Sequence, residues 1–409
     1  MVAFPRPNFT RRPPWLDLLA GRDFRWMLLN TFVLDMGYYL RIAAQSWVVL
    51  ELTNQPVWVG LVNGVRIFPV LALSLIGGVV TDRMDRRHIL FWVRSGLAGL
   101  ALTVALLIST GAVRPWHLIG VSLGIGAVIS FGSPAYYAFI FDLAGKSRLW
   151  VANSMMAVVS NAGAIAGPVM AGALLAGTGA DAVFYIAAAL YMSGAIGILF
   201  IRAQKTEPAR PAPMARELRA GLSYVRNTPH IAWLMVISLT TIAHSAIHPL
   251  LPFYAKDILN MGAAGYGLLT GAFGLGLFCG SVLLALTPVV KRKGVVILIA
   301  TLVWDGAMAG FGLSRTFPLS MFLVFVIGVA GAYYGNALVT MLQSMSSDQM
   351  RGRVMSIFSI TAEFAAVGWF IGGALAQWIG NEHALVIAAA AGAGLTLVAF
   401  AASPVLRRS

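Results

Sequence analysis

The sequence has few charged residues, few acids and a single cysteine. Only 11% of its 409 residues are charged, and Asp and Glu together number 15. One cysteine, Cys279, excludes an intrachain disulfide, a metal site built from paired cysteines and two-thiol redox chemistry. The small charged fraction beside 59% apolar residues, with a mean hydropathy of +0.81, is not the composition of a soluble chain.

The sequence does contain enough apolar chain for about twelve membrane-spanning helices, since about twenty residues cross a hydrocarbon core of about 30 Å. It therefore predicts an all-α membrane protein with twelve transmembrane helices. Its 43 glycines suit this class, because small residues let membrane helices pack closely. The predicted spans are 25–51, 57–80, 88–109, 116–142, 149–176, 182–202, 231–255, 263–287, 294–313, 318–343, 353–379 and 383–402.

Lys and Arg residues are distributed unevenly about these spans. Most of the 29 lie in segments on the side of the N-terminus, whereas the opposite side has only Arg114, Lys256 and Arg315. Basic loops resist translocation, so we expect both termini in the cytoplasm. The net charge of +14 then belongs to loops that face an anionic leaflet. Nucleic acid is not an expected partner, because the basic residues are scattered over short segments.

A polar stretch at 203–230 divides the chain into two halves. The expected parts are an N-terminal cytoplasmic segment 1–24, a six-helix bundle 25–202, a cytoplasmic linker 203–230, a second six-helix bundle 231–402 and a cytoplasmic tail 403–409. Within the linker, the pattern over 214–227 predicts a short amphipathic helix on the membrane surface.

The two halves resemble each other in sequence. The segment 167–179 aligns without a gap with 368–380, because both have glycines at the same spacing. Similarly, Tyr136-Tyr137 matches Tyr333-Tyr334, and Gly60-Leu61 matches Gly267-Leu268. Three matches in the same order indicate a duplicated six-helix unit, so the two bundles should be pseudo-symmetric.

The turn between the second and third spans carries a charged motif, Gly78-Val-Val-Thr-Asp82-Arg83-Met-Asp85-Arg86-Arg87. It resembles the Gly-x-x-x-Asp-Arg-x-Gly-Arg-Arg/Lys signature of the major facilitator superfamily, with Asp85 in place of the second glycine. The resemblance implies a cytoplasmic gate, in which Asp82 faces the N-terminal end of a helix from the other half and Arg86 pairs with a carboxylate. The expected gate residues are Gly78, Asp82, Arg83, Arg86 and Arg87, with Asp142 as the carboxylate and the helix near Arg353 as the partner. An ordinary basic loop is the alternative.

Two further motifs narrow the resemblance. Gly163-Ala-Ile-Ala-Gly167-Pro168-Val-Met-Ala-Gly172 is similar to the Gly-Pro motif of drug/proton antiporters, where it implies an interface between the halves; plain packing is the alternative. The segment 348–356 and the opening 22–25 resemble the bacterial exporter branch that includes enterobactin exporters and macrolide efflux proteins. That resemblance implies a multi-pass secondary transporter in the bacterial inner membrane.

Ionisable residues inside the spans are candidates for proton coupling or substrate binding, since each costs about 2.5 to 3.5 kcal/mol at a bilayer centre. If the first and fourth spans line a cavity, as the resemblance implies, then Asp35, Arg41 and Arg66 form a charged wall; a structural Asp–Arg bridge is the alternative. Glu363 lies midway along the eleventh span. Asp305, in the ninth, is expected to hydrogen-bond within the bundle.

Aromatic, amide and imidazole groups form a second set of candidates: Tyr136, Tyr137, Tyr333, Tyr334, Asn336, His244 and His248. The tyrosines and the amide suit an amphipathic organic molecule, with packing as the alternative. The histidines are four residues apart and should share one helix face. No third ligand is near in sequence, so lining the cavity or proton-sensitive hydrogen bonding is favoured over a metal.

These patterns predict a transporter that exports an amphipathic organic compound, drug-like or siderophore-like, in exchange for protons by alternating access. The alternative is a lipid or lysolipid translocator, or an uptake symporter, on the same fold. No enzymatic activity and no cofactor are expected. The glycines of 271–276 lie in an apolar span without a phosphate-binding lysine, so the energy source should be the proton gradient. Expected partners are the substrate, protons and membrane lipids, and the protein should be a monomer.

Overall fold

The structure is a computed structural model that describes residues 14–145, 148–202, 214–286, 292–347 and 349–403, and within these ranges every regular element is a helix. The first half contains α1 (Pro14–Ala20), α2 (Arg22–Thr53), α3 (Pro56–Gly64), α4 (Ile67–Arg83), α5 (Arg86–Ser109), α6 (Pro115–Ala144), α7 (Leu149–Gly177) and α8 (Ala180–Leu199). The segment between the halves contains α9 (Met214–Asn227).

The second half begins with a broken span. Its helices are α10 (Pro229–Ser238), α11 (Thr240–His244), the 3₁₀-helix η1 (Ser245–Ile247), α12 (Leu251–Phe253) and the π-helix η2 (Tyr254–Ile258). Pro249 and Pro252 cannot donate backbone hydrogen bonds, which accounts for the irregular geometry here. The remaining helices are α13 (Gly262–Leu286), α14 (Lys293–Leu313), α15 (Phe317–Met345), α16 (Arg351–Glu363), α17 (Ala365–Ile379) and α18 (Asn381–Ala402).

Within the described residues, 11 helical segments are long and apolar enough to cross a membrane. The predicted first span forms the 32-residue helix α2, but α2 is not among these segments. Its charged residues, including Asp35 and Arg41, lower its hydropathy. It nevertheless packs along α7 and α8 as part of the same bundle.

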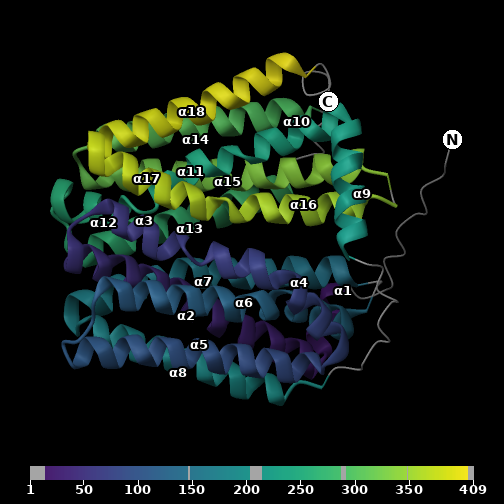
Figure 1. The fold of residues 1–409 in the computed structure, drawn as a ribbon, viewed down its shortest axis with the longest axis horizontal. Coiled ribbons are helices and arrows are strands. Elements are labelled where there is room, and N and C mark those ends of the chain that lie inside the picture. Colours follow the sequence, from purple (N-terminus) through teal and green to yellow (C-terminus); the bar gives the residue numbers. More distant parts are fainter. Residues whose placement is uncertain (1–13, 146–147, 203–213, 287–291, 348, 404–409) are drawn as a thin grey trace.

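The helices of both halves run along one common direction, with α9 across one end (Figure 1). We call this the α9 end; the α4–α5 turn also lies there. The opposite end, with the α2–α3 turn at Asn54–Gln55, is the far end. The predicted amphipathic helix in the linker is confirmed as a helix with the expected bounds, Met214–Asn227. It packs on α10 and α16 of the second half.

The two halves meet mainly where α7 packs on α13 and α3 packs on α17. These contacts require glycine, because a Cβ on Gly172 would lie 2.8 Å from the Cα of Gly267, and one on Gly60 would lie 2.3 Å from the Trp369 carbonyl oxygen. Gly60 and Gly267, which the internal repeat aligns, thus make corresponding contacts with the opposite half. Both interfaces are therefore close-packed in the same way.

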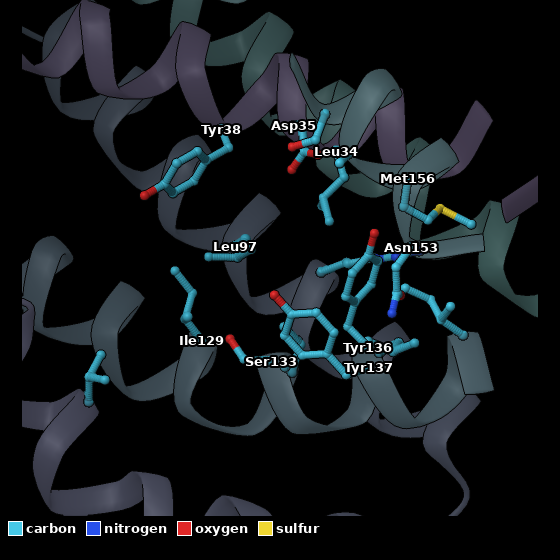
Figure 2. Close-up of a pocket in the computed structure, with 18 of the residues that line it drawn as sticks. Leu34, Asp35, Tyr38, Leu97, Ile129, Ser133, Tyr136, Tyr137, Asn153 and Met156 are labelled. Carbon is cyan, nitrogen blue, oxygen red and sulfur yellow. The ribbon is translucent and has the colours of Figure 1, made fainter. Parts of the chain in front are cut away.

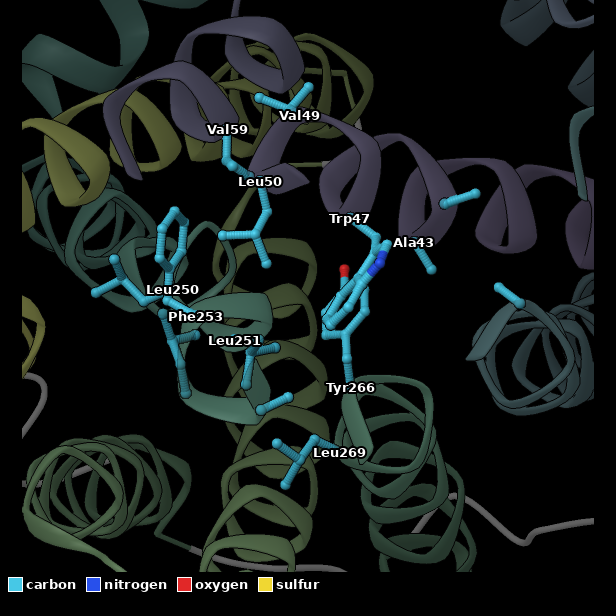
Figure 3. Packing of buried hydrophobic residues seen from close by; sticks show 14 of the residues in the cluster. Ala43, Trp47, Val49, Leu50, Val59, Leu250, Leu251, Phe253, Tyr266 and Leu269 are labelled. Carbon is cyan, nitrogen blue, oxygen red and sulfur yellow. The ribbon is translucent and has the colours of Figure 1, made fainter. Parts of the chain in front are cut away.

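Apolar side chains complete this contact, which we call the far-end seam. The rings of Trp47 and Tyr266 stack with centroids 6.0 Å apart, and Leu50 and Val59 face Leu250 and Phe253 (Figure 3). The Lys256 ammonium also donates to the Asn54 side chain at 3.3 Å. The glycine contacts along α7 and α13 continue from Gly172 to Ala164, which faces Gly274. The seam thus closes the molecule from the far end to its middle.

Candidate functional site

A cavity of about 810 Å³ lies between the halves, on the α9 side of the far-end seam. Most of its wall comes from α2, α4, α5, α6 and α7, and the second half adds residues of α15 and α16. Leucine, isoleucine and valine side chains give it an apolar surface, into which a few polar groups are set. The polar, charged and aromatic lining residues include Arg66, Arg94, Ser160, Gln343 and Glu363. Others are labelled in Figure 2: Asp35, Tyr38, Ser133, Tyr136, Tyr137 and Asn153.

Asp35 and Arg94 form one charged part of the wall in the first half. Asp35 of α2 accepts a hydrogen bond from Ser160 of α7 and lies within electrostatic range of Arg94. Arg94 of α5 is only 1% exposed, and it donates to the Asn30 side-chain oxygen and, at 3.0 Å, to the Gly194 carbonyl. Its Nε and Nη2 atoms have no hydrogen-bond partner in the described part of the chain. The guanidinium is thus held in place but retains donors for a ligand.

Arg66 and Glu363 face the cavity from opposite halves, and each lies at a helix break. Arg66 is between α3 and α4, and it donates to the Tyr38 hydroxyl at 2.5 Å. Glu363 ends α16, one residue before Phe364 interrupts that span. The two charges are close enough to interact. A change in the relative position of the halves would change this interaction directly.

The prediction that Arg41 lines the cavity is wrong. Arg41 is 3% exposed and donates to the Gln45 amide oxygen at 2.8 Å. Gln45 in turn donates to Asn63 at 3.2 Å and to Ser122 at 3.0 Å, so Arg41 belongs to a buried network of the first half. Sequence reasoning missed Arg94, although its position inside an apolar span was a usable signal.

Of the predicted aromatic residues, Tyr136 and Tyr137 line the cavity, with ring centroids 5.5 Å apart (Figure 2). Tyr333, Tyr334 and Asn336 do not, because α15 presents Val339 and Gln343 instead. Tyr334 is buried and donates to the Ile237 carbonyl at 3.0 Å. Tyr334 belongs to an apolar cluster of the second half, and Tyr333 packs against that cluster. The Asn336 amide donates to the Ala332 carbonyl.

The helix changes to a 3₁₀ turn between the two histidines, and their closest partners differ. His244 contacts Asp305 of α14 at 3.2 Å, whereas His248 stacks on Trp369 of α17 with centroids 5.1 Å apart. Neither lines the cavity. Asp305, expected to hydrogen-bond within the bundle, makes this contact with His244 inside the second half. Across the described ranges no group of three or more potential metal ligands is found.

At the α9 end, Arg86 of α5 pairs with Asp142 of α6 at 2.5 Å, the pairing that the motif predicts. Asp85 accepts a hydrogen bond from the Arg87 amide at 2.9 Å and so caps the start of α5. This explains why an aspartate suits the position at which the superfamily signature has glycine. The Arg87 guanidinium donates to the Ile201 carbonyl at 3.4 Å.

The other expected gate residues are only partly placed. Arg83 is exposed, and Arg353 of α16 packs beside Gly221 of α9. The side chain of Asp82 and the packing of Gly78 lie outside the described part of the structure. As far as their described residues show, α4 and α16 are not among the helices that pack extensively on each other.

The glycine motif of α7 serves two interfaces. Gly172 and the Pro168 carbonyl contact Gly267, at the junction of the halves. Gly163 and Gly167 instead approach Met36 of α2, so they pack inside the first half. The expected interface role thus applies to the second part of the motif only.

The fold and the cavity between its two halves define a membrane transporter of the major facilitator type. The chain belongs to the transmembrane secretion effector family, whose model matches residues 15–407. It is similar to the enterobactin exporters EntS of Shigella boydii serotype 18 and Escherichia coli O81, each 27% identical over 327 residues, or 79% of this chain and 77% of the relative.

Solved structures share the fold. A bacterial homologue of the human lysosomal transporter Spinster, in an inward-facing and occupied conformation, has a TM-score of 0.72 at 13% identity and covers 97% of this chain and 98% of its own. The nucleoside transporter NupG has a TM-score of 0.74 at 14% identity, with 93% and 99% covered.

Proposed function

We propose that this protein exports an amphipathic organic compound in exchange for protons across a bacterial inner membrane. In this proposal α2 is also a membrane span and brings the number of spans to twelve. Both termini and the α9 end are cytoplasmic. The protein is a monomer that transports without ATP. The observation that carries the proposal is the cavity between the halves, closed by the far-end seam and lined by paired charges and aromatic rings. Such a cavity loads from the α9 end.

The lining supports a substrate that is apolar in part and charged or polar in part. A volume of about 810 Å³ falls within the range of sites for small organic molecules. Tyr136 and Tyr137 offer ring faces, while Arg94 offers unpaired donors and Asp35 an acceptor. The relatives named as enterobactin exporters favour a siderophore-like compound over a lipid.

Proton coupling is assigned to Asp35 and Glu363. A carrier's conformational equilibrium responds only to ligands that bind its states differently. Asp35 lies near Arg94, and Glu363 lies near Arg66 across the junction of the halves. Movement of the halves alters both environments, so each acid would hold its proton more tightly in one state than in the other.

The test uses proteoliposomes with an imposed pH gradient. A thermal-shift screen of siderophores, macrolides and dyes first selects a compound that stabilises the protein. Its flux should follow the gradient in the wild type, and Asp35→Asn and Glu363→Gln should remove that dependence. Asp181→Asn, at a partly exposed acid at the start of α8 that does not line the cavity, is the matched control and should transport normally. Wild-type flux that ignores the gradient contradicts the proposal.

The same vesicles separate the alternatives. Movement of the substrate in the same direction as the protons, rather than in the opposite direction, indicates an uptake symporter. A lysolipid translocator requires lateral openings with an apolar floor. Here α3 and α7 of the first half pack directly on α17 and α13 of the second half. The four charged side chains of the cavity also disfavour an acyl chain as cargo.

A further inference from the structure

A second buried acid–base pair lies outside the cavity, between α11 and α14. His244 Nε2 and Asp305 Oδ1 are 3.2 Å apart, and each residue is 3% exposed. The imidazole stacks on the Trp304 ring with centroids 4.5 Å apart. Gly392 of α18 leaves room for the carboxylate, because a Cβ there would lie 2.7 Å from Oδ1. The pair therefore occupies a closely packed, buried position.

Apart from His244, the side chains around Asp305 are mainly aromatic and offer its carboxylate little stabilisation. From α15, the Tyr334 ring meets the edge of His244, and its hydroxyl bonds the Ile237 carbonyl and the Thr240 hydroxyl. From α13, Phe273 packs on Trp304, and α18 contributes the Gly392 backbone. Among the described residues, neither oxygen of Asp305 has a hydrogen bond of good geometry. Within the described ranges, the imidazole of His244 is the one ionisable group that pairs with Asp305.

This pair adjoins a link between two broken spans. His244 is the last residue of α11, and the 3₁₀ turn begins at Ser245, a geometry that often marks a hinge. The Ser245 hydroxyl donates at 2.8 Å to the carbonyl of Ala365, the first residue of α17. Ala365 lies two residues after Glu363. The link thus connects the pair to the cavity acid of the second half.

We propose that the His244–Asp305 pair is a proton-binding site that sets the bend of the α10–α12 span and, through the Ser245–Ala365 link, the position of Glu363. With one proton the pair is neutral overall, whether as imidazole and carboxylic acid or as imidazolium and carboxylate. Loss of that proton to water leaves one negative charge among apolar groups, which burial strongly disfavours. Deprotonation therefore favours a conformation that separates α11 from α14.

The structure contains the packed pair together with a cavity beside the α9 end, so the protonated form should favour this conformation. Spin labels at Val158 of α7 and Val282 of α13, both exposed, report on the α9 side of the junction. In the full-length chain with Cys279→Ser, the distance between the labels should shorten as the pH rises from about 5 to about 9. No substrate is needed, so the result is independent of the proposed cargo.

Variants assign this change to the pair. Asp305→Asn and His244→Gln should remove the pH-dependent shift or move its midpoint by at least one pH unit, whereas the control His248→Gln should match the wild type. An unchanged midpoint in Asp305→Asn overturns the proposal. If these variants fail to fold, the fluorescence of the wild type minus that of Trp304→Phe provides a second readout. That difference should titrate over the same range, and a difference independent of pH also overturns the proposal.

Discussion

Arg86 and Asp142 join the first turn of α5 to the last turn of α6 at the α9 end. The Asp142 side chain is 4% exposed and that of Arg86 is 17% exposed, so water screens their attraction weakly. Arg86 also donates to the Ala138 carbonyl at 3.3 Å. The pair therefore fixes the angle between two helices that line the cavity.

Arg86→Ala should lower the free energy of unfolding by about 3 kcal/mol, because it removes the Arg86 cation from a buried carboxylate. Adding Asp142→Asn should recover part of this loss, since the second change removes the negative charge of that carboxylate. Thermal unfolding in detergent measures both. Equal stability of the single and double variants would contradict a direct coupling between the two side chains.

Whether a charged residue lines the cavity depends on the rotation of its helix and on its position along the helix axis. The sequence alone does not specify either. Leu34, Asp35 and Tyr38 line the cavity, and Arg41 continues the same helical stripe. One turn nearer the far end, however, the halves are in contact, and Arg41 turns to Gln45 instead. By contrast, the Arg86–Asp142 pairing could be predicted, because a known motif specifies both the position and the chemistry.

At the scale of elements, the interface between α7 and α13 has almost no space to spare. Gly172→Val should force these helices apart by overpacking, which costs about 1–3 kcal/mol. A penalty of that size changes a two-state population about 5- to 150-fold. Spin labels at Thr178 and Met261, at the far end of each helix, should show a longer distance. Gly177→Val on the same helix is the control, because a Cβ there meets nothing within 4 Å.

Helix positions were largely predictable, whereas helix interruptions were not. The amphipathic pattern of 214–227 gave the bounds of α9, and most spans followed from hydropathy. Pro249 and Pro252 account for the break late in the seventh predicted span. The break at Phe364, beside Glu363, has no proline or other local signal. It depends on tertiary contacts, such as that of Ser245 with Ala365.

At the scale of the whole molecule, the internal sequence repeat predicted two similar halves. Equivalent glycines of the repeat form equivalent interfaces between them. The direction of insertion is a separate prediction. In a Cys279→Ser background, Thr110→Cys at the α5–α6 turn should react with a membrane-impermeant maleimide added to intact spheroplasts. Met84→Cys at the α4–α5 turn should react only after lysis. The opposite pattern would place the termini outside the cell.

The four charges of the cavity have an electrical consequence. With Asp35 and Glu363 ionised, they balance Arg66 and Arg94, so the empty cavity has no net charge to move through the membrane field. Each bound proton adds one positive charge, worth about 2.3 kcal/mol per 100 mV. Return of the proton-loaded carrier should therefore generate a measurable current and accelerate with voltage, while movement of the empty, deprotonated carrier should not.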